Sequence, residues 1–265
     1  MFEQEIASLL EDLGYHVETN SAFLDRELEK SRELDARAVK VAHNDEANCI
    51  QVIAELLVEC KDMAAPLVFV TRNKNARERQ SPTPGEYRFP KAAYPKRLPN
   101  NAYVEVPAFQ HLQLAQHHYY YREDGKATQF AKVVRKGSDW VANHEGIYDS
   151  LILPMAKALE ARKKAVKDSV QGSAWRAIWL FFPIVVLREG LFVMSADPSH
   201  RTPEERQRVS FIRELDSEVV RGHYLTDFVV AEHLKSFIAN DIQSFVSQVV
   251  ELAKARPRVV RGDEA

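Results

Sequence analysis

Asp35, Glu59 and Lys61 are three charged residues whose types and spacing could do hydrolytic chemistry. Glu59 and Lys61 close a largely apolar run over residues 50–58, and Asp35 lies in an earlier stretch of strand-forming sequence. Because successive side chains of a strand alternate faces, Glu59 and Lys61 share a face and lie about 6.6 Å apart. If Asp35 lies on the neighbouring strand, two carboxylates meet beside one ammonium group, which suits a hard divalent cation with a cationic helper. Such a set predicts the hydrolysis of phosphodiester bonds.

The same charged residues also have a purely structural interpretation. Glu59 and Lys61 could form an ion pair that caps the end of the strand and binds nothing. A Glu-x-Lys spacing alone does not separate the two interpretations, because it occurs by chance on many exposed strands. Its context favours a binding site, since charges buried at the end of an apolar strand are costly unless they bind a partner.

The elements that must position these side chains are predicted from the hydrophobic pattern. Apolar residues at helical spacing over 2–13 predict a first helix, and Gly14 is a typical stop. Strands are predicted over residues 15–23, 28–42, 48–62 and 66–71. Asp35 then falls on the second strand and Glu59 on the third. The order of elements predicts an α/β fold, at the border of α+β, with a mixed central sheet flanked by helices.

The rest of the chain is expected to complete a single domain over residues 1–256. A long basic loop is predicted over 73–101, where Pro, Arg and Asn replace apolar periodicity. A long amphipathic helix is predicted from residue 147, and Pro154 should kink it or start its second half. Other predictions are short helices over 108–121 and 127–136, strand hairpins over 177–196 and 208–230, a closing helix over 230–252, and a flexible tail over 257–265.

Composition and charge limit the class of protein. With 45% hydrophobic and 28% charged residues the chain can bury a core, and its net charge of −2 means that attraction to nucleic acid must come from a local patch. The apolar stretch over 175–194 is split by Arg188, so no membrane span is predicted. The N-terminus lacks the basic start of a secretory signal, so a cytoplasmic location is expected. Cys49 and Cys60 fall on opposite faces of one predicted strand, so no disulfide is expected.

The residues resemble the PD-(D/E)xK phosphodiesterase superfamily, which has the restriction endonuclease-like fold. The matching pieces, in the first quarter of the chain, are the opening helix with Glu3 and the segments 32–35 and 57–61. Leu34 stands where the nominal motif has proline. On this resemblance, the expected metal ligands for Mg²⁺ or Mn²⁺ are Asp35, Glu59 and the carbonyl oxygen of Cys60. Lys61 is expected to assist the attacking water, and Glu3 to supply an acidic side chain from the first helix.

The same resemblance implies a metal-dependent nuclease. DNA is the expected substrate, and low sequence specificity is expected because no helix-turn-helix or zinc finger is recognisable. Four basic residues past the strand of Glu59, directly after the fourth predicted strand, either grip the nucleic-acid backbone or belong to an ordinary solvated loop: Arg72, Lys74, Arg77 and Arg79. A homodimer or larger complex in prokaryotic defence or repair is expected by analogy alone. The alternative function is a catalytically inactive nuclease-like module that binds nucleic acid or protein.

Overall fold

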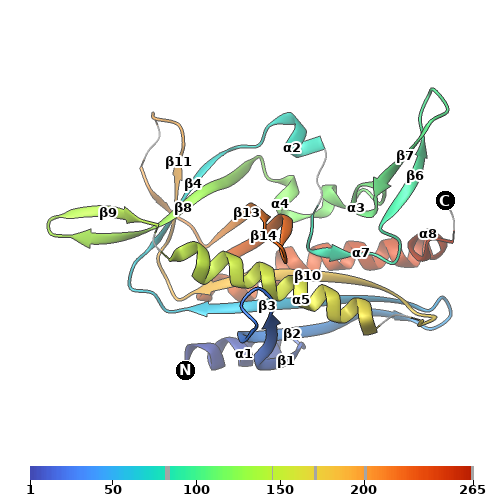
Figure 1. Ribbon diagram of the computed structural model, residues 1–265, viewed down its shortest axis with the longest axis horizontal. Coiled ribbons are helices and arrows are strands. Elements are labelled where there is room, and N and C mark those ends of the chain that lie inside the picture. The colour runs from blue at the N-terminus through green and yellow to red at the C-terminus, as the bar shows by residue number, and fades with distance from the viewer. Residues whose placement is uncertain (81–83, 145, 170–171, 200–201, 264–265) are drawn as a thin grey trace.

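The computed structural model describes residues 1–80, 84–144, 146–169, 172–199 and 202–263. Within these ranges the fold is mixed α/β, with helices flanking a large mixed sheet of 12 strands (Figure 1). The predicted α/β class is confirmed at this level. The strands follow the order β1 (His16–Asp25), β2 (Lys30–Asp45), β3 (Ile50–Lys61), β10 (Arg176–Leu187), β14 (Arg221–Val230), β13 (Arg208–Asp216), β8 (Gly125–Lys136), β4 (Leu67–Asn73), β11 (Leu191–Ser195) and β12 (Glu204–Glu205).

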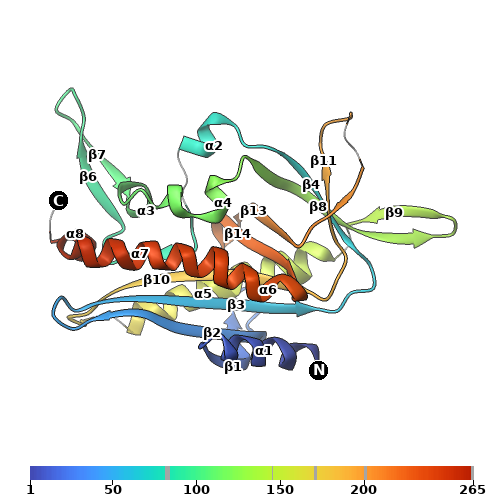
Figure 2. The ribbon, with the colours of Figure 1, turned by 180° about the vertical axis from the view of Figure 1, so that it is seen from behind.

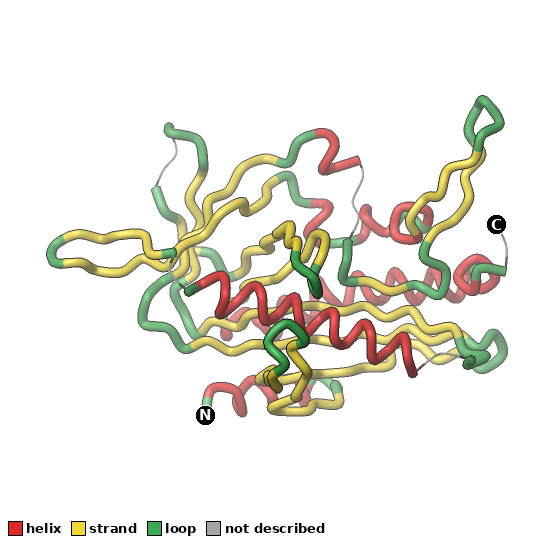
Figure 3. The backbone as a smooth tube through the Cα atoms, viewed as in Figure 1, coloured by secondary structure: helices red, strands yellow, loops and turns green. Residues whose placement is uncertain are grey.

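Shorter strands and the helices complete the described part of the chain. β5 (Tyr87–Arg88) pairs with β10, β9 (Asp139–Asn143) pairs with β8, and β6 (Ala93–Arg97) and β7 (Tyr103–Pro107) form a separate two-stranded sheet. The helices are α1 (Phe2–Asp12), α2 (Ala76–Gln80), α3 (Ala108–His111), α4 (Tyr119–Arg122), α5 (Leu153–Ser169), α6 (Ala231–Phe237), α7 (Gln243–Ala255) and α8 (Pro257–Arg261). Figure 3 shows the β8–β9 and β6–β7 hairpins projecting from the molecule. In the described residues, no helix has the length and apolar content needed to cross a membrane.

The N-terminal unit follows the predicted order of one helix and three strands. Gly14 takes the left-handed φ of +80° that ends α1 and turns the chain into β1. β1, β2 and β3 then pair as an antiparallel meander. The polar turn between β2 and β3 is closed by Asp45, whose side chain accepts a hydrogen bond from the backbone N–H of Asn48 at 2.9 Å.

A crossover through α5 adds β10 parallel to β3. The two strands pair along their whole length, from Arg176 opposite Ile50 to Leu187 opposite Lys61. Pro154 lies one residue inside α5, directly after a π-helical turn over Tyr148–Ile152. A proline cannot donate a helical hydrogen bond, so this change of helical register is expected there.

Two apolar clusters lie on the two faces of the β1–β2–β3–β10 part of the sheet. On one face α1 and α7 pack over Val58, Phe182 and their neighbours (Figure 2). On the other face α5 packs over Leu57 and Phe181 (Figure 1). Because β3 and β10 are buried on both faces, they are almost continuously apolar, as is typical of central parallel strands.

The structure corrects the predicted hairpin over 177–196. β10 pairs with β3 and β14, whereas β11 pairs parallel with β4. The turn at Arg188 to Gly190 therefore separates strands on different parts of the sheet. A long apolar strand gains more from two long neighbours than from the short strand that follows it in the sequence. The second predicted hairpin, of β13 and β14, is confirmed.

Three other segments also differ from the sequence expectation. The predicted helix over 127–136 is strand β8, which is paired with β4 and β9. The predicted loop over 73–101 contains α2, β5 and β6, and Tyr94 within it is buried. Where a flexible tail is predicted after residue 256, Pro257 begins α8, because a proline is well tolerated in the first helical turn.

Candidate active site

Asp35 lies beside the end of β3. The antiparallel pairing of β2 and β3 ends at Ala36 opposite Val58, so Asp35 is the next residue outward and faces the Glu59–Lys61 segment. Its Oδ2 accepts a hydrogen bond from the backbone N–H of Cys60 at 2.6 Å. A side-chain bond to the backbone of the partner strand fixes the carboxylate at this end of the sheet.

Glu59 and Lys61 form a close pair on one face of β3. Lys61 Nζ donates to Glu59 Oε1 at 2.5 Å, and the two side chains are 27% and 17% exposed, respectively. Burial raises the pKa of Glu59 above its ordinary value and outweighs the ion pair with Lys61. The negative charges of Asp35 and Glu3 raise the pKa further. Several carboxyl groups therefore crowd one lysine, and a cation placed among them would lower their electrostatic energy.

Glu3 comes from the first turn of α1. Its own side chain is exposed, yet its charge raises the pKa values of both Glu59 and Cys60, so the start of α1 lies near the end of β3 (Figure 2). The apolar face of α1, which includes the buried Phe2 and Ile6, holds the helix against the sheet. The structure thus brings together Glu3, Asp35, Glu59 and Lys61.

Arg188 also joins these elements, and sequence reasoning missed it. Its guanidinium lies 4.3 Å from the ring centroid of Phe2, and its Nε donates to Asp62 at 2.9 Å. The backbone N–H of Arg188 also donates to the carbonyl oxygen of Lys61 at 3.2 Å. Arg188 thus ties α1 to the ends of β3 and β10. The sequence contains no local signal for this contact because Arg188 lies far from Phe2 along the chain.

The donor chemistry of the site suits a hard cation. The carboxylates of Asp35 and Glu59 and the carbonyl of Cys60 are oxygen donors of the type that Mg²⁺ and Mn²⁺ accept, with water in the remaining positions. Burial raises the pKa of the Cys60 thiol to about 12, so its sulfur stays protonated and is a poor ligand. Among the residues that the structure describes, no three His, Cys, Asp or Glu side chains form a group that could hold a metal ion. Any ion here would therefore rest on two carboxylates, a carbonyl and water.

The four basic residues expected to contact nucleic acid differ in their surroundings. Arg72, near the end of β4, pairs with Glu78 at 3.5 Å, and Arg79, on α2, pairs with Asp124 at 3.1 Å; both arginine side chains are exposed. The side chain of Arg77 lies outside the described part of the structure.

Lys74 does not present its ammonium group at the surface. The residue is 4% exposed, and its Nζ donates to the carbonyl oxygens of Tyr120 and Glu123. It also lies 3.9 Å from the ring centroid of Tyr120. Burial lowers the pKa of Lys74 to about 8. The expectation that it grips a phosphate is therefore corrected, because the side chain is used to hold α4 against β4.

A buried polar cluster beside α4 is a feature that the sequence did not indicate. Asp227 accepts hydrogen bonds from the hydroxyls of Tyr119 at 2.6 Å and Ser210 at 2.5 Å, and burial raises its pKa to about 6. His118 is fully buried and bonds through Nε2 to the hydroxyl of Tyr87 at 2.5 Å. His118, Tyr119 and Tyr120 therefore pack in the core and fix α4 on the sheet.

Glu86, in the same region, predicts a specific pH dependence of stability. One of its oxygens accepts from the backbone N–H of Leu225 at 2.5 Å, and the other has no hydrogen-bond partner among the described residues. Burial raises the pKa of Glu86 to about 7. The folded protein therefore binds this proton more tightly than the unfolded chain, so stability falls as the pH rises toward and through about 7. A Glu86→Gln variant, which stays neutral, should lose less free energy of unfolding between about pH 5 and about pH 8, by up to about 3 kcal/mol.

Urea unfolding of both proteins across this pH range measures the difference. Glu105→Gln, at an exposed position on β7, is the matched control and should follow the wild type. Equal pH slopes for the wild type and Glu86→Gln would show that Glu86 is not protonated in the fold.

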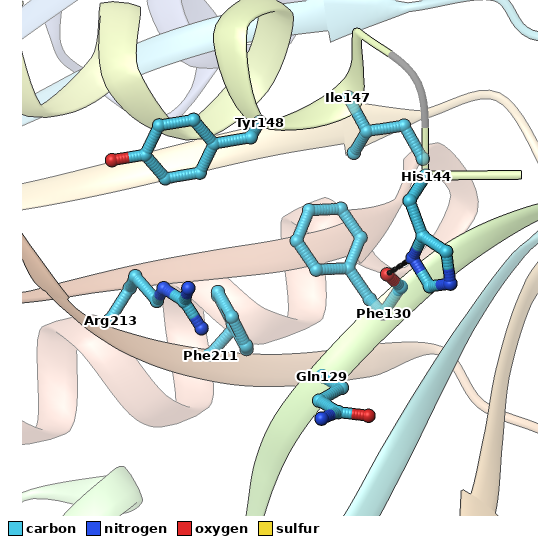
Figure 4. A pocket seen from close by; sticks show the side chains of 7 residues that line it. All are labelled: Gln129, Phe130, His144, Ile147, Tyr148, Phe211 and Arg213. Carbon is cyan, nitrogen blue, oxygen red and sulfur yellow. Dashed lines mark hydrogen bonds between the residues drawn. The ribbon is translucent and has the colours of Figure 1, made fainter.

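A cavity of about 350 Å³ lies between β8, β13 and the start of the long helix. The lining side chains are Gln129, Phe130, His144, Ile147, Tyr148, Phe211 and Arg213 (Figure 4). His144 Nδ1 bonds to the carbonyl oxygen of Phe130 at 3.2 Å. This cavity does not include Asp35, Glu59 or Lys61, so the candidate active site is a strand end and not this pocket.

The site combines two carboxylates on adjacent strands, an additional carboxylate on a helix, and one lysine. Chemically, this arrangement can hold a divalent cation at its oxygen atoms and place an ammonium group beside it. The same groups without a cation form an ion pair at a strand end. No protein-family model, curated protein or solved structure matches the chain.

Proposed function

We propose that this protein is a divalent-metal-dependent nuclease of the PD-(D/E)xK type, which hydrolyses phosphodiester bonds of DNA with low sequence specificity. The observation that carries the proposal is the position of Asp35. Its carboxylate is bonded to the backbone of Cys60, between Glu59 and Lys61, on the adjacent antiparallel strand. Both halves of the motif therefore meet, although Asp35 and Glu59 lie 24 positions apart in the sequence.

The surrounding topology supports the restriction endonuclease-like fold. An opening helix, an antiparallel meander of three strands, and a helix that leads to a fourth strand parallel to the third surround the site. α1 and α5 cover opposite faces of this sheet. This is the mixed central sheet flanked by helices that the resemblance implies.

The residues have distinct roles in the proposed chemistry. Asp35, Glu59 and the Cys60 carbonyl would hold Mg²⁺ or Mn²⁺, which when bound polarises the phosphate and lowers the pKa of a water molecule. Lys61 would place its ammonium group beside the attacking water and offset negative charge on the phosphate. Glu3, from α1, would accept hydrogen bonds from water at the edge of the site.

The second candidate is an inactive nuclease-like module that binds nucleic acid or protein. The short Lys61–Glu59 pair favours it, because this pair neutralises one carboxylate without a cation. The lack of a three-residue metal group in the described chain also favours it.

Divalent cations distinguish the two candidates. A cation that binds only the folded protein stabilises it, by about 2.7 kcal/mol at 100 times its dissociation constant. We therefore expect Mg²⁺ or Mn²⁺ to raise the melting temperature by several degrees, and to support cleavage of linear, circular or single-stranded DNA that stops in chelator.

An Asp35→Asn, Glu59→Gln double variant is the matched control, since it keeps the size of both side chains. It should melt at the same temperature with and without the cation and should not cleave. Cleavage that continues in chelator would rule out the proposed chemistry. An equal cation effect on the double variant would place the ion elsewhere.

A further inference from the structure

A cleft lined by basic side chains lies at the other end of the sheet from Glu59. It has a volume of about 390 Å³. It forms where the end of β5 and the segment after it meet the start of β10 and the C-terminal end of α8. We call it the cationic cleft, because four basic residues from distant parts of the sequence line it: Arg88, Lys91, Arg176 and Arg261. Phe89, Pro90, Ala177 and Gly262 complete the lining.

Backbone carbonyl groups hold the three guanidinium groups in place. Arg88 donates to the carbonyl oxygen of Lys163 at 3.2 Å, and Arg176 donates to that of Ser173 at 2.8 Å. Arg261 donates to the carbonyl oxygen of Asn48. A carbonyl fixes a guanidinium group without cancelling its charge, and several N–H donors on each group remain for a ligand.

Lys91 is positioned by aromatic and glycine contacts. Its Nζ lies 5.0 Å from the ring centroid of Tyr94. Gly262 ends α8 with a φ of +82°, and a Cβ at this position would lie 2.9 Å from Lys91 Cδ. A glycine is therefore needed for the close approach of α8 to Lys91.

Few negative charges balance the cationic cleft. Within the described residues, Arg261 pairs with Asp263 at 2.7 Å, whereas Arg88, Lys91 and Arg176 have no carboxylate at ion-pair distance. Arg72 and Arg79, in contrast, each pair with a carboxylate. Fixed cations that repel one another without compensation favour the binding of an anion, and planar guanidinium groups match the oxygens of a phosphate.

The cationic cleft lies one strand length from the candidate active site. Arg176 stands opposite Ile50 at one end of the β3–β10 pair, and Lys61 lies at the other end (Figure 2). Eleven steps along a strand span roughly 36 Å. This distance corresponds to about 10 base pairs of duplex at about 3.4 Å each. On α5, whose Lys163 carbonyl oxygen accepts from Arg88, the side chains of Lys164 and Lys167 are exposed.

We propose that the cationic cleft binds backbone phosphates of a nucleic acid and anchors it about one helical turn from Asp35, Glu59 and Lys61. This inference rests on the proposed function in one respect, namely that the ligand is a nucleic acid. It also reassigns the binding surface from Arg72 and Arg79 to residues that only the fold brings together. Affinity at the cleft should depend on salt and not on base sequence, because the contacts are to phosphates.

Binding of a fluorescent 24-base-pair duplex to the full chain, measured in chelator so that no cleavage occurs, tests the inference. A Lys91→Gln, Arg176→Gln double variant should bind about 10-fold to 100-fold more weakly. The slope of log affinity against log salt should become shallower by about 1.8, since each phosphate contact contributes about 0.9. The matched control removes two exposed charges from β6, Lys96→Gln with Arg97→Gln, and should change affinity less than about 2-fold. Equal losses in the two double variants, with unchanged melting temperatures, would overturn the inference.

Substrate length and a small anion complete the experiment. With Mg²⁺, the cleft variant should cleave the long duplex with a raised KM and an unchanged kcat, but should cleave a 6-base-pair duplex as the wild type does. Inorganic phosphate is the small-anion probe. If the cleft variant loses the binding of inorganic phosphate but binds the duplex as the wild type does, the cleft is a site for free anions, which contradicts the inference. If the wild type cleaves nothing yet the cleft variant loses duplex binding, the nuclease proposal fails and the cleft stands. If the wild type cleaves DNA and the cleft variant binds the duplex normally, the proposal for the cleft fails and the nuclease proposal stands.

Discussion

Replacing Lys61 with alanine is expected to slow DNA cleavage by about 100-fold or more, with little effect on substrate affinity. The ammonium group of Lys61 donates to Glu59 Oε1 at 2.5 Å, at the strand end where Asp35 also lies. Without it, the proposed site lacks the ammonium group that positions the water and adds to the charge stabilisation by the metal ion. Single-turnover rates with saturating Mg²⁺ would measure the loss in the chemical step.

Two further variants separate catalysis from folding. Lys30→Ala removes an exposed lysine at the start of β2 and should cleave as the wild type does. Lys61→Arg keeps the positive charge and should retain more activity than Lys61→Ala. Because Lys61 also pairs with Glu59, the melting temperature of each variant must be compared. Wild-type cleavage by a folded Lys61→Ala protein would remove this lysine from the chemistry.

Replacing Glu55 with alanine is expected to cause the largest loss of stability among single changes in the sheet. Glu55 is fully buried in β3, and its Oε1 accepts from Arg37 Nε at 2.7 Å and from Arg162 Nε at 2.6 Å. Alanine would remove the buried partner that two partly buried arginines, Arg37 of β2 and Arg162 of α5, share. Breaking a buried pair costs about 3 to 5 kcal/mol, which corresponds to roughly 6 to 20 °C in melting temperature for a domain near this size.

The exposed partner of the same arginine offers a matched control. Arg37 NH1 also pairs with Glu18 at 2.7 Å, and the Glu18 side chain is 46% exposed. Glu18→Gln should cost less than about 1 kcal/mol, because exposed pairs are screened by water. Thermal and urea unfolding of both variants would measure the difference. Similar losses for Glu55→Ala and Glu18→Gln would mean that burial does not strengthen this network.

The sequence could predict the N-terminal part of the fold because its signals are local. The apolar stripe of α1, the stop at Gly14, the alternation along β2 and the apolar run of β3 all act within one element or between neighbours. A short turn between β2 and β3 constrains them to pair as an antiparallel hairpin, and this pairing brings Asp35 to Cys60. The residues of the candidate site could therefore be named before the structure, except for Arg188.

Pairing between distant strands could not be predicted in the same way. The apolar run of β10 fits a hairpin with β11 as well as a central strand, since both bury its side chains. The structure places β10 between β3 and β14, where both faces and both edges are covered. Likewise, β8 has a sequence that suits a helix or a strand, and its pairing with β4 decided the outcome.

The basic residues show most clearly what the sequence determines and what the tertiary structure determines. The sequence by itself determined that the segment from Arg72 to Arg97 is rich in positive charge, together with the local order of strands that carries Asp35, Glu59 and Lys61. Only the tertiary structure decided that Lys74 is buried, and that Arg88 and Lys91 meet Arg176 and Arg261 in one cleft. The physical reason is that charge and periodicity belong to the local sequence. Burial and the convergence of charges depend instead on which distant elements pack together, and this is set by the total apolar area that the whole chain can bury.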